Sequence, residues 1–278
     1  MVTLKQTDMP ITIDLENDCA IRYEEPVVFE LNKFKTAGDM KGLLQKDGYR
    51  PDDETFYSYY RGIVEKDAVP TFAKFDDHYD LTIIMPNGFE NGECKKTSGH
   101  YHKYIPGCHS SYAEIYEVIL GKALFVLQKI NDHTLPSDLV RVEDVFFVEV
   151  NQGEMVVLPP LYGHCSINIG DGPMVFSNIA SCKNKSDYRV VKELHGMSYY
   201  VVKENGKTKA VKNPNYGNVP EPRVMKVTEN REMGIVFNRP LYRSYLENPA
   251  LYGYVANPIG RENDMMDLLE EKKPQGLL

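Results

Sequence analysis

The chain has no tryptophan and little cysteine. Its five cysteines are an odd number, lie scattered over 278 residues and form no Cys-x-x-Cys pair. A disulfide framework or a zinc knuckle needs paired or regularly spaced cysteines, so the sequence argues against both. A run of eighteen apolar residues and an N-terminal apolar segment of the secretory type are also missing, which excludes a recognisable transmembrane helix and signal peptide. The cytoplasm is therefore the expected compartment.

Basic residues are also fewer than acidic ones. The chain has 32 Lys and Arg against 40 Asp and Glu, a formal net charge of −8. A general nucleic-acid binder normally presents a basic face, so the composition argues against that class and leaves no nucleic-acid or membrane partner to expect. The length is sufficient for one generous domain, or one domain with sizeable arms, around a full hydrophobic core.

Short strand patterns dominate the middle of the chain. Runs rich in β-branched and aromatic residues alternate with turn residues, and they predict strands at 56–60, 79–85, 113–120, 123–128, 145–150, 154–158, 165–169, 174–179 and 198–202. Gly121-Lys122 predicts a compact hairpin turn between two of them. Many short strands without helix-length patterns between them predict an all-β fold, an antiparallel double-sheet barrel or jelly roll.

The two ends of the chain have a different character. Residues 1–54 mix short extended pieces with a helix expected to begin near Thr36, and we predict an N-terminal arm packed on a barrel of residues 55–205. Residues 206–278 are rich in Asn, Pro, Lys and Glu, yet they carry Tyr242, Tyr245 and Tyr252. A disordered tail rarely holds so many aromatic residues, so this C-terminal extension is expected to wrap the barrel or a partner subunit.

Three histidines and a glutamate have the distribution of a metal site. Residues i and i+2 of a strand face the same side, so His100 and His102 can bind one ion together, and Glu114 and His164 can complete the site. A single His-x-His also occurs on solvated strands and is weak evidence by itself. Three imidazole nitrogens and one carboxylate, with coordination positions left open, suit Fe, Mn, Ni, Co or Zn in a catalytic site.

The wider spacing strengthens this interpretation. Glu114 is followed after six residues by Gly121, Gly153 after five by Pro159, and His164 after three by Asn168. These spacings resemble the paired motifs of the cupin superfamily, G(x)5HxH(x)nE(x)6G and G(x)5PxG(x)2H(x)3N. The resemblance implies a cupin jelly roll, a double-stranded β-barrel.

Two departures from the cupin motifs concern residues that are not ligands. Cys94 and Leu161 stand where the motifs have glycine. Eleven residues, 103–113, separate His102 from Glu114, where cupins often have only a few. This insertion contains His109, which becomes a rival ligand or active-site group.

The resemblance narrows further over roughly residues 55 to 202. Segments 79–88, 96–102, 113–116, 157–164 and 168–173 together are similar to the cupin-type phosphoglucose isomerases found mainly in archaea. That family implies a homodimeric enzyme of glycolysis and gluconeogenesis, which interconverts glucose 6-phosphate and fructose 6-phosphate with one divalent metal ion per subunit. Fe²⁺ or Mn²⁺ is favoured, with Zn²⁺, Ni²⁺ or Co²⁺ as alternatives. The resemblance implies the metal ligands His100, His102, Glu114 and His164 and the phosphate contacts Tyr57, Thr82, Thr97, Gly99 and Tyr188.

The chemistry of an aldose–ketose isomerisation fits these residues. A proton moves between C1 and C2 while the charge of an enediolate is stabilised, and a carboxylate beside a metal ion can carry that proton. Glu114 is therefore the candidate base, and Tyr116, on the same strand face, is expected to orient Glu114 or the sugar. The hydroxyl of Thr97 and the backbone amides near Gly99 are donors that suit a phosphate. For Tyr57 and Tyr188 the alternative stays open that tyrosine is simply a common strand residue.

One departure concerns the reaction itself. Ser186-Asp187-Tyr188 stands where the family has His-Asp-Tyr, whose histidine is a candidate for opening the sugar ring. Ring opening would then use His109, His195, Lys95 or water, or the substrate would differ.

Two other functions compete with the isomerase. A cupin with three histidines and a glutamate around Fe or Mn can be an oxygenase, and a non-catalytic sugar-binding cupin can use the same ligands for structure. An isomerase needs a phosphate pocket, whereas an oxygenase needs an apolar position for oxygen. Thr82, Thr97 and Gly99 favour the phosphate pocket and hence the isomerase.

Overall fold

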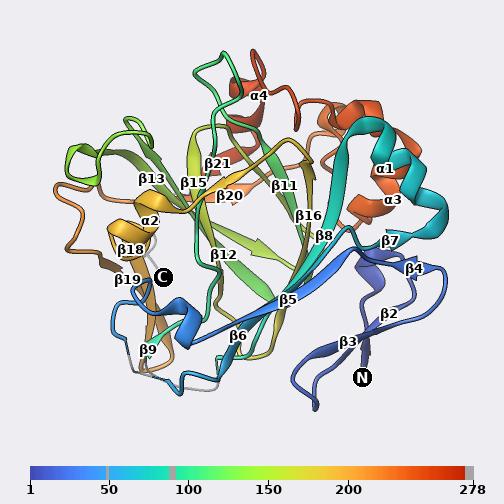
Figure 1. Cartoon of the computed structure of the whole chain (residues 1–278), viewed down its shortest axis with the longest axis horizontal. Helices are drawn as coiled ribbons and strands as arrows, with labels where there is room; N and C mark the ends of the chain where they lie inside the picture. The colour runs from blue at the N-terminus through green and yellow to red at the C-terminus, as the bar shows by residue number, and fades with distance from the viewer. Residues whose placement is uncertain (48–49, 88–91, 273–278) are drawn as a thin grey trace.

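Two mainly antiparallel sheets face each other and form a β-barrel at the centre of the molecule (Figure 1). The computed structural model describes residues 1–47, 50–87 and 92–272. Gly88 of the family-like segment and the last six residues of the expected C-terminal extension lie outside these ranges. No helix of the described part of the chain is long and apolar enough to cross a membrane.

The first sheet has six strands in the order β14-β11-β16-β8-β6-β5. Neighbouring strands in it are antiparallel throughout. Their bounds are β14 (Met155–Leu158), β11 (Glu114–Leu120), β16 (Met174–Ser181), β8 (Asp77–Ile84), β6 (Thr55–Arg61) and β5 (Leu31–Thr36).

The second sheet has the order β15-β12-β13-β20-β21. Its bounds are β15 (Tyr162–Asn168), β12 (Lys122–Ile130), β13 (Val142–Asn151), β20 (Arg223–Val227) and β21 (Leu269–Glu271). The last two strands come from the C-terminal extension, and β20 runs parallel to β13. The extension therefore continues this sheet at its edge.

Shorter elements surround the two sheets. The short strands are β1 (Val2–Thr3), β2 (Ile11–Asp14), β3 (Ala20–Tyr23), β4 (Val27–Val28), β7 (Val64–Glu65), β9 (Gly92–Glu93), β10 (Tyr101–His102), β17 (Ser186–Asp187), β18 (Tyr199–Glu204) and β19 (Lys207–Lys212). The α-helices are α1 (Val69–Phe75), α2 (Arg189–Glu193), α3 (Leu241–Glu247) and α4 (Glu262–Met266). Single 3-10 turns lie at Lys5–Thr7, Gly38–Met40, Lys66–Ala68, Ser137–Leu139, Arg231–Met233 and Pro249–Tyr252.

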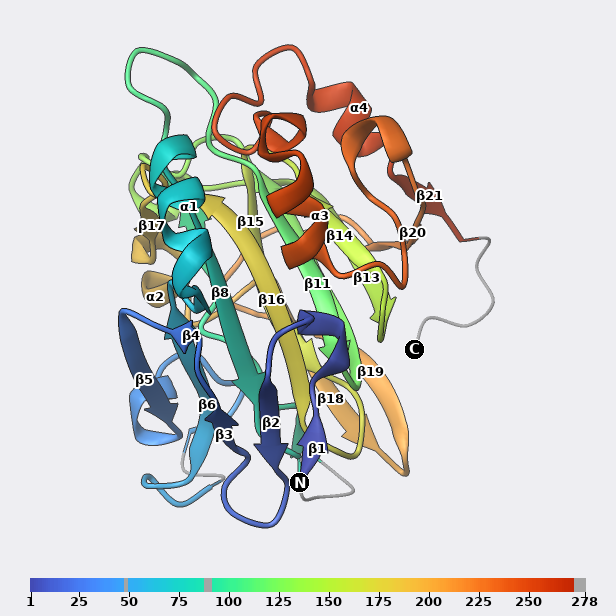
Figure 2. The same ribbon diagram turned by 90° about the vertical axis from the view of Figure 1, so that its right-hand side faces the viewer.

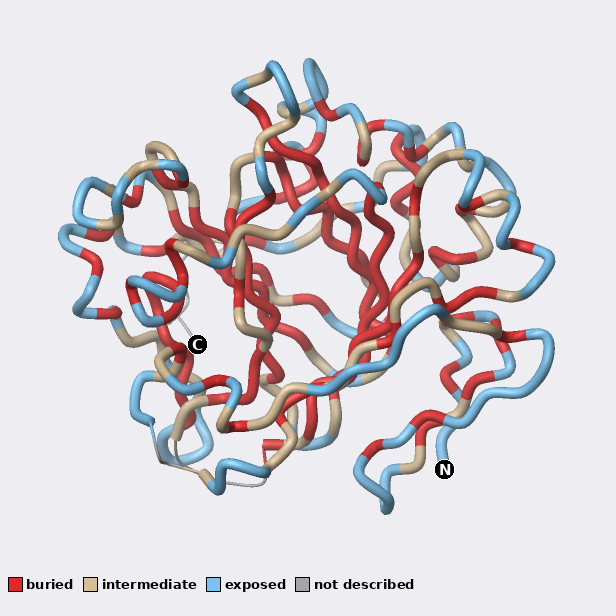
Figure 3. The backbone as a smooth tube through the Cα atoms, in the orientation of Figure 1, coloured by how far each residue is buried: buried red, intermediate tan, exposed pale blue. Residues whose placement is uncertain are grey.

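The apolar residues form two layers, one inside the barrel and one outside the first sheet. Side chains such as Tyr116, Phe125 and Phe176 pack between the two sheets. The alternate residues Tyr79, Ile115 and Ile179 join an outer layer instead, as the period of two in a strand requires. The buried segments accordingly lie in the barrel strands, and the exposed ones at the periphery (Figure 3).

Both ends of the chain cover the outer face of the first sheet. The N-terminal strands β1 to β3 and helix α3 lie against this face, as Figure 2 shows. Leu4, Ile11 and Ile13 from one end and Tyr242 and Tyr245 from the other are buried in the outer layer. The outer face of the sheet is therefore packed from both ends of the chain.

The structure confirms the all-β cupin barrel and corrects two local predictions. The helix expected near Thr36 is only the 3-10 turn Gly38–Met40, which follows β5. Gly121 does not close a hairpin, because β11 pairs with β14 and β16, whereas β12 pairs with β13 and β15. It is the corner at which the chain crosses between sheets, with φ of 82°, and a Cβ there would lie 2.7 Å from the Pro173 oxygen.

Candidate metal centre and substrate cavity

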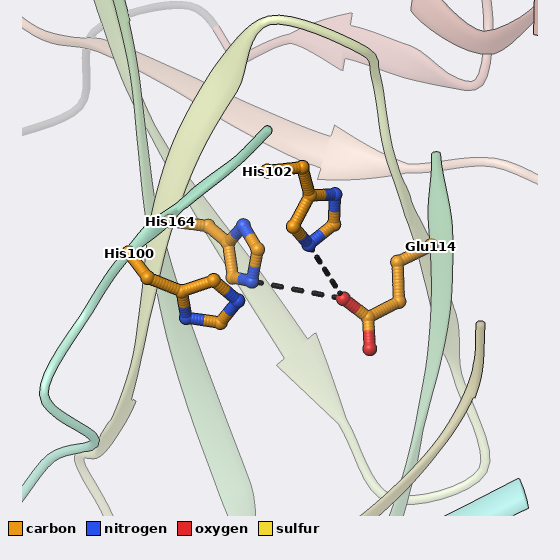
Figure 4. Close-up of side chains that lie close together, drawn as sticks. All are labelled: His100, His102, Glu114 and His164. Carbon is orange, nitrogen blue, oxygen red and sulfur yellow. Dashed lines mark ion pairs between the residues drawn. The ribbon is translucent and has the colours of Figure 1, made fainter. Parts of the chain in front are cut away.

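The four residues expected to bind metal lie together inside the barrel. One ligand atom from each of His100, His102, Glu114 and His164 lies within 4.8 Å of all the others. Glu114 reaches from the start of β11 toward the three imidazoles (Figure 4). The backbones of His100 and His164 are tied by two hydrogen bonds, in which each N–H donates to the other carbonyl at 3.1 and 2.9 Å. The pair is therefore positioned by the main chain before any ion binds.

The donor set fits a cation. His102 Nδ1 lies 2.8 Å from the Tyr112 carbonyl, which can only accept, so this nitrogen carries the hydrogen. The other ring nitrogen, Nε2, lies 3.1 Å from Glu114 Oε2. The same Nε2 is buried and has no hydrogen-bond partner within the described chain. An imidazole nitrogen and a carboxylate oxygen that face each other in a buried site are donor atoms that a metal ion uses, so the site suits a metal ion.

The protonation states support the same conclusion. Burial lowers the pKa of His100 well below its ordinary value, and the two neighbouring imidazoles lower it further. Burial, followed by His102, lowers the pKa of His164 to about 3. Burial alone would raise the pKa of Glu114, but its histidine neighbours outweigh burial and hold that pKa below its ordinary value. Neutral imidazoles and an ionised carboxylate are the forms that bind metal.

Glu114 is held through both of its carboxylate oxygens. Oε2 faces His102 and also lies 3.8 Å from His164 Nε2. Oε1 accepts a hydrogen bond of 2.7 Å from Asn178 Nδ2 on β16. Asn178 was not predicted as a site residue, because a single Asn in a buried apolar strand has no motif of its own. The pairing of Asn178 with Tyr116 in the neighbouring strand brings it to Glu114.

Tyr116, the second predicted catalytic residue, lies beside the cluster. Its hydroxyl is 3.2 Å from His164 Nε2, and its ring packs against Phe125 at a centroid distance of 5.3 Å. Burial raises the pKa of Tyr116 well above its ordinary value, and Glu114 adds to the effect. The hydroxyl is therefore protonated and lies directly beside the cluster.

A cavity of about 1200 Å³ opens onto the cluster. Its walls include every residue expected to contact phosphate: Tyr57, Thr82, Thr97, Gly99 and Tyr188. Ser98, expected to contribute only its backbone amide, also lines the cavity, and its Oγ lies 3.1 Å from the Tyr57 hydroxyl. Thr97 has a structural role too, because its hydroxyl accepts from the Ser166 N–H at 3.1 Å.

Gly99 has a packing reason to be glycine. Its φ is 74°, in the left-handed region, and a Cβ would lie 3.0 Å from Met197 Sδ. The glycine is therefore required by the backbone whether or not its N–H meets a phosphate.

The position that lacks the family histidine lies in this cavity. Ser186 on β17 pairs with His102 on β10 and lines the cavity wall. His109 instead packs against Tyr104 and lines a separate small cavity, so it does not join the metal cluster. Lys95 pairs with Glu54 at 2.7 Å. Neither Lys95 nor His195 is among the described residues that line the main cavity.

Charged residues that were not predicted also line the cavity. His78 and Asp80 on β8 and Arg61 at the end of β6 form a network, with Asp80 in contact with both of the others. Burial raises the pKa of Asp80, but His78 and Arg61 outweigh burial and hold it below the ordinary value. No spacing motif connects these residues in the sequence, so only the strand pairing reveals the group.

Leu161 has the backbone conformation that the glycine of the cupin motif would adopt. Leu161 has φ of 70°, the left-handed conformation in which the cupin motif has glycine. Two residues later Gly163 touches the Tyr101 ring, where a Cβ would lie 2.5 Å from Cε1. The turn before His164 thus keeps its shape although one glycine is replaced.

Comparison with known proteins identifies the family of the chain. A family model described as glucose-6-phosphate isomerase (GPI) matches residues 34–218. The glucose-6-phosphate isomerase of Thermococcus litoralis is 29% identical over 206 residues, which cover 70% of this chain and 99% of that protein. The one of Pyrococcus abyssi is 31% identical over 183 residues, 64% of this chain and 84% of that protein. The chain therefore belongs to the glucose-6-phosphate isomerase family, in its cupin-type form.

Proposed function

We propose that this protein interconverts glucose 6-phosphate and fructose 6-phosphate at a divalent metal ion. The observation that carries the proposal is the His100, His102, Glu114 and His164 cluster, which lies at a cavity large enough for a sugar phosphate. Membership of the glucose-6-phosphate isomerase family gives the reaction class.

The metal ion would be held by these three histidines and Glu114. When bound, it supplies positive charge that stabilises the enediolate formed as the proton moves between C1 and C2. Fe²⁺ or Mn²⁺ is our choice, with Zn²⁺, Ni²⁺ or Co²⁺ as alternatives, because imidazole and carboxylate ligands accept all of them.

Glu114 would carry the proton between the two carbons. Its carboxylate lines the cavity beside the cluster, so a sugar carbon can come within reach of it. Asn178 fixes the plane of the carboxylate through Oε1, and that orientation limits which oxygen can take a proton. Tyr116 would orient the metal site through its contact with His164 rather than touch the proton.

The phosphate would lie among Tyr57, Thr82, Thr97, Gly99 and Tyr188. Tyr57 and Ser98 offer neighbouring hydroxyls, and burial raises the pKa of Tyr57 to about 12, so it stays a donor. Tyr188 lies against the His100 ring at 5.3 Å, which would connect the phosphate end of the cavity to the metal cluster. Lys192, near the Tyr188 ring, adds positive charge on this side.

A coupled assay tests the proposal against its alternatives. Metal-loaded protein is incubated with fructose 6-phosphate, and glucose 6-phosphate is followed with oxygen consumption in the same sample. Glucose 6-phosphate that forms without oxygen uptake supports the isomerase. Oxygen uptake would indicate a cupin oxygenase, and binding without turnover would indicate a sugar-binding cupin. We also propose that the protein is a homodimer and that it acts in the cytoplasm. Light scattering of the purified protein measures the oligomeric state.

A further inference from the structure

Three neighbouring strands place Glu114 and His78 on either side of a small residue. Ile115 on β11 pairs with Ile179 on β16, so the next residues along the two strands, Glu114 and Ala180, lie side by side. Ala180 pairs in turn with His78 on β8. All three line the main cavity. With strands about 4.8 Å apart, the backbones of Glu114 and His78 are roughly 10 Å apart, with only a methyl group between them.

Side chains on one face of a sheet stand roughly perpendicular to it, so Glu114 and His78 project side by side into the cavity with the short Ala180 side chain between them. The space over Ala180 is open to a substrate. The two residues on either side of Ala180 carry different groups: Glu114 has a carboxylate that belongs to the metal cluster, and His78 has an imidazole. One molecule over Ala180 can therefore touch both groups.

The contact with Asp80 fixes the orientation of the His78 ring. Its Nδ1 is buried and lies 2.9 Å from Asp80 Oδ2, off the line of an ideal hydrogen bond. Asp80 is fully buried, and its Oδ1 accepts from the Gly62 N–H at 2.9 Å, while Arg61 pairs with Oδ2. The carboxylate therefore cannot turn away from the ring. The His78 side chain is 27% exposed although Nδ1 is buried, so its accessible part faces the cavity.

The reaction needs a group that this chain lacks at the expected place. Hexose phosphates are mainly cyclic in water, whereas proton transfer between C1 and C2 requires the open chain. Ser186 cannot serve as an acid near neutral pH, and His109, His195 and Lys95 lie elsewhere. We propose that His78, held by Asp80, is the catalytic residue that opens the sugar ring, an inference that rests on the proposed isomerase function.

The step balances without any further reactant. The C1–O5 bond of glucose 6-phosphate breaks with its electron pair going to O5, and O5 takes a proton from His78 Nε2. The hydroxyl hydrogen on O1 leaves to water as the C1 carbonyl forms, and His78 regains a proton from water. No electrons are gained or lost. Fructose 6-phosphate opens in the same way at C2.

The surroundings of His78 favour its protonated form. Burial lowers the pKa of His78, whereas Asp80 and Glu114 raise it. The two carboxylates outweigh burial, so the pKa of His78 lies above its ordinary value. Arg61 opposes this shift, and Asp77 and Asp76 are the other charged groups nearby on the same segment. A histidine in this state can donate a proton and recover it near neutral pH.

The test measures ring opening separately from isomerisation. Exchange between the α and β anomers of glucose 6-phosphate is followed by NMR with parent protein, with His78→Asn and with His78→Gln. We expect the parent to accelerate anomer exchange and both variants to lose roughly 10² of that acceleration. Metal content should remain at the parental value, because His78 is not in the cluster. The matched control is His109→Asn, the same change in the separate cavity, which should behave as the parent does.

Isomerisation gives an independent signature. Sugar that opens spontaneously in water remains a substrate for the variants. At high protein concentration spontaneous ring opening then limits the reaction, so the rate of glucose 6-phosphate formation should reach a plateau as more variant protein is added. The proposal is overturned if either variant retains parental anomer exchange, or if the parent isomerises without accelerating anomer exchange. If the parent does not form glucose 6-phosphate from fructose 6-phosphate at all, the isomerase function itself fails.

Discussion

At the scale of single residues, Glu114 would act both as a metal ligand and as the base that carries the proton. One carboxylate oxygen lies at the metal cluster and the other accepts from Asn178. A metal-bound carboxylate is a weaker base than a free one, and the Asn178 hydrogen bond weakens it further. The arrangement therefore requires the proton-carrying oxygen to release one of its partners during the reaction.

Replacing Glu114 by Gln tests its role as base. The amide keeps one ligating oxygen, and Asn178 can turn its own amide to accept instead of donate, so metal binding should survive in part. Turnover is expected to fall by about 10² or more, because the proton acceptor is gone. Exchange of the C2 hydrogen in heavy water should decline in parallel. A variant that holds metal and isomerises at parental speed would make Glu114 purely structural.

At the scale of elements, the turn that leads into β15 deviates from its motif. Leu161 occupies a left-handed conformation that costs a residue with a Cβ roughly 1–2 kcal/mol. Its N–H donates to the Ser111 hydroxyl at 2.7 Å, which holds the turn against the insertion that follows His102. Backbone anchoring thus substitutes for the missing glycine.

A pair of substitutions isolates that backbone cost. Leu161→Gly and Leu161→Ala both remove the leucine side chain, but only glycine adopts φ of 70° without strain. We expect the glycine variant to have a free energy of unfolding about 1 kcal/mol higher than the alanine variant. Urea unfolding of the two proteins measures the difference. Equal stabilities would mean that the turn relaxes in the alanine variant.

At the scale of the whole molecule, Glu117 links the two ends of the chain to the barrel. It is buried on β11, where Oε1 accepts from Gln6 Nε2 at 2.8 Å and Oε2 accepts from the Leu241 N–H at 3.0 Å. Burial raises the pKa of Glu117 to about 8, although these hydrogen bonds oppose the shift. The folded protein therefore keeps a proton that the unfolded chain has already released.

This difference makes stability depend on pH. Between the ordinary value of 4.5 and about 8 the folded state binds the extra proton, so its free energy of unfolding falls as pH rises, by at most about 1.4 kcal/mol per pH unit from this group. Glu117→Gln resembles the protonated acid and removes this dependence. In urea titrations from pH 5 to 8, the variant should gain stability relative to the parent as pH rises. A constant difference across that range would refute the shifted pKa.

The sequence predicted the parts of the site that depend on short spacing. The metal cluster follows from His100 and His102 at i and i+2 and from the distances to Glu114 and His164 within their motifs. Asn178, His78 and Asp80 escaped prediction because β16 and β8 are buried along almost their whole length, so their patterns do not show which residues face the cavity. Arg61, at the end of β6, belongs to no spacing motif either. The pairing of distant strands decides that, and no local pattern encodes it. The same is true of Glu117, whose partners come from both ends of the chain.

Removing and restoring the metal in one sample tests directly whether the reaction depends on the cluster of His100, His102, Glu114 and His164. Turnover of fructose 6-phosphate and bound metal are measured before chelation, after chelation and after addition of Fe²⁺ or Mn²⁺, with His164→Ala treated in the same way. We expect activity and metal content to disappear and return together in the parent, and both to stay low in the variant. Full activity in parent protein that contains no metal would show that the reaction does not depend on a metal ion at this cluster.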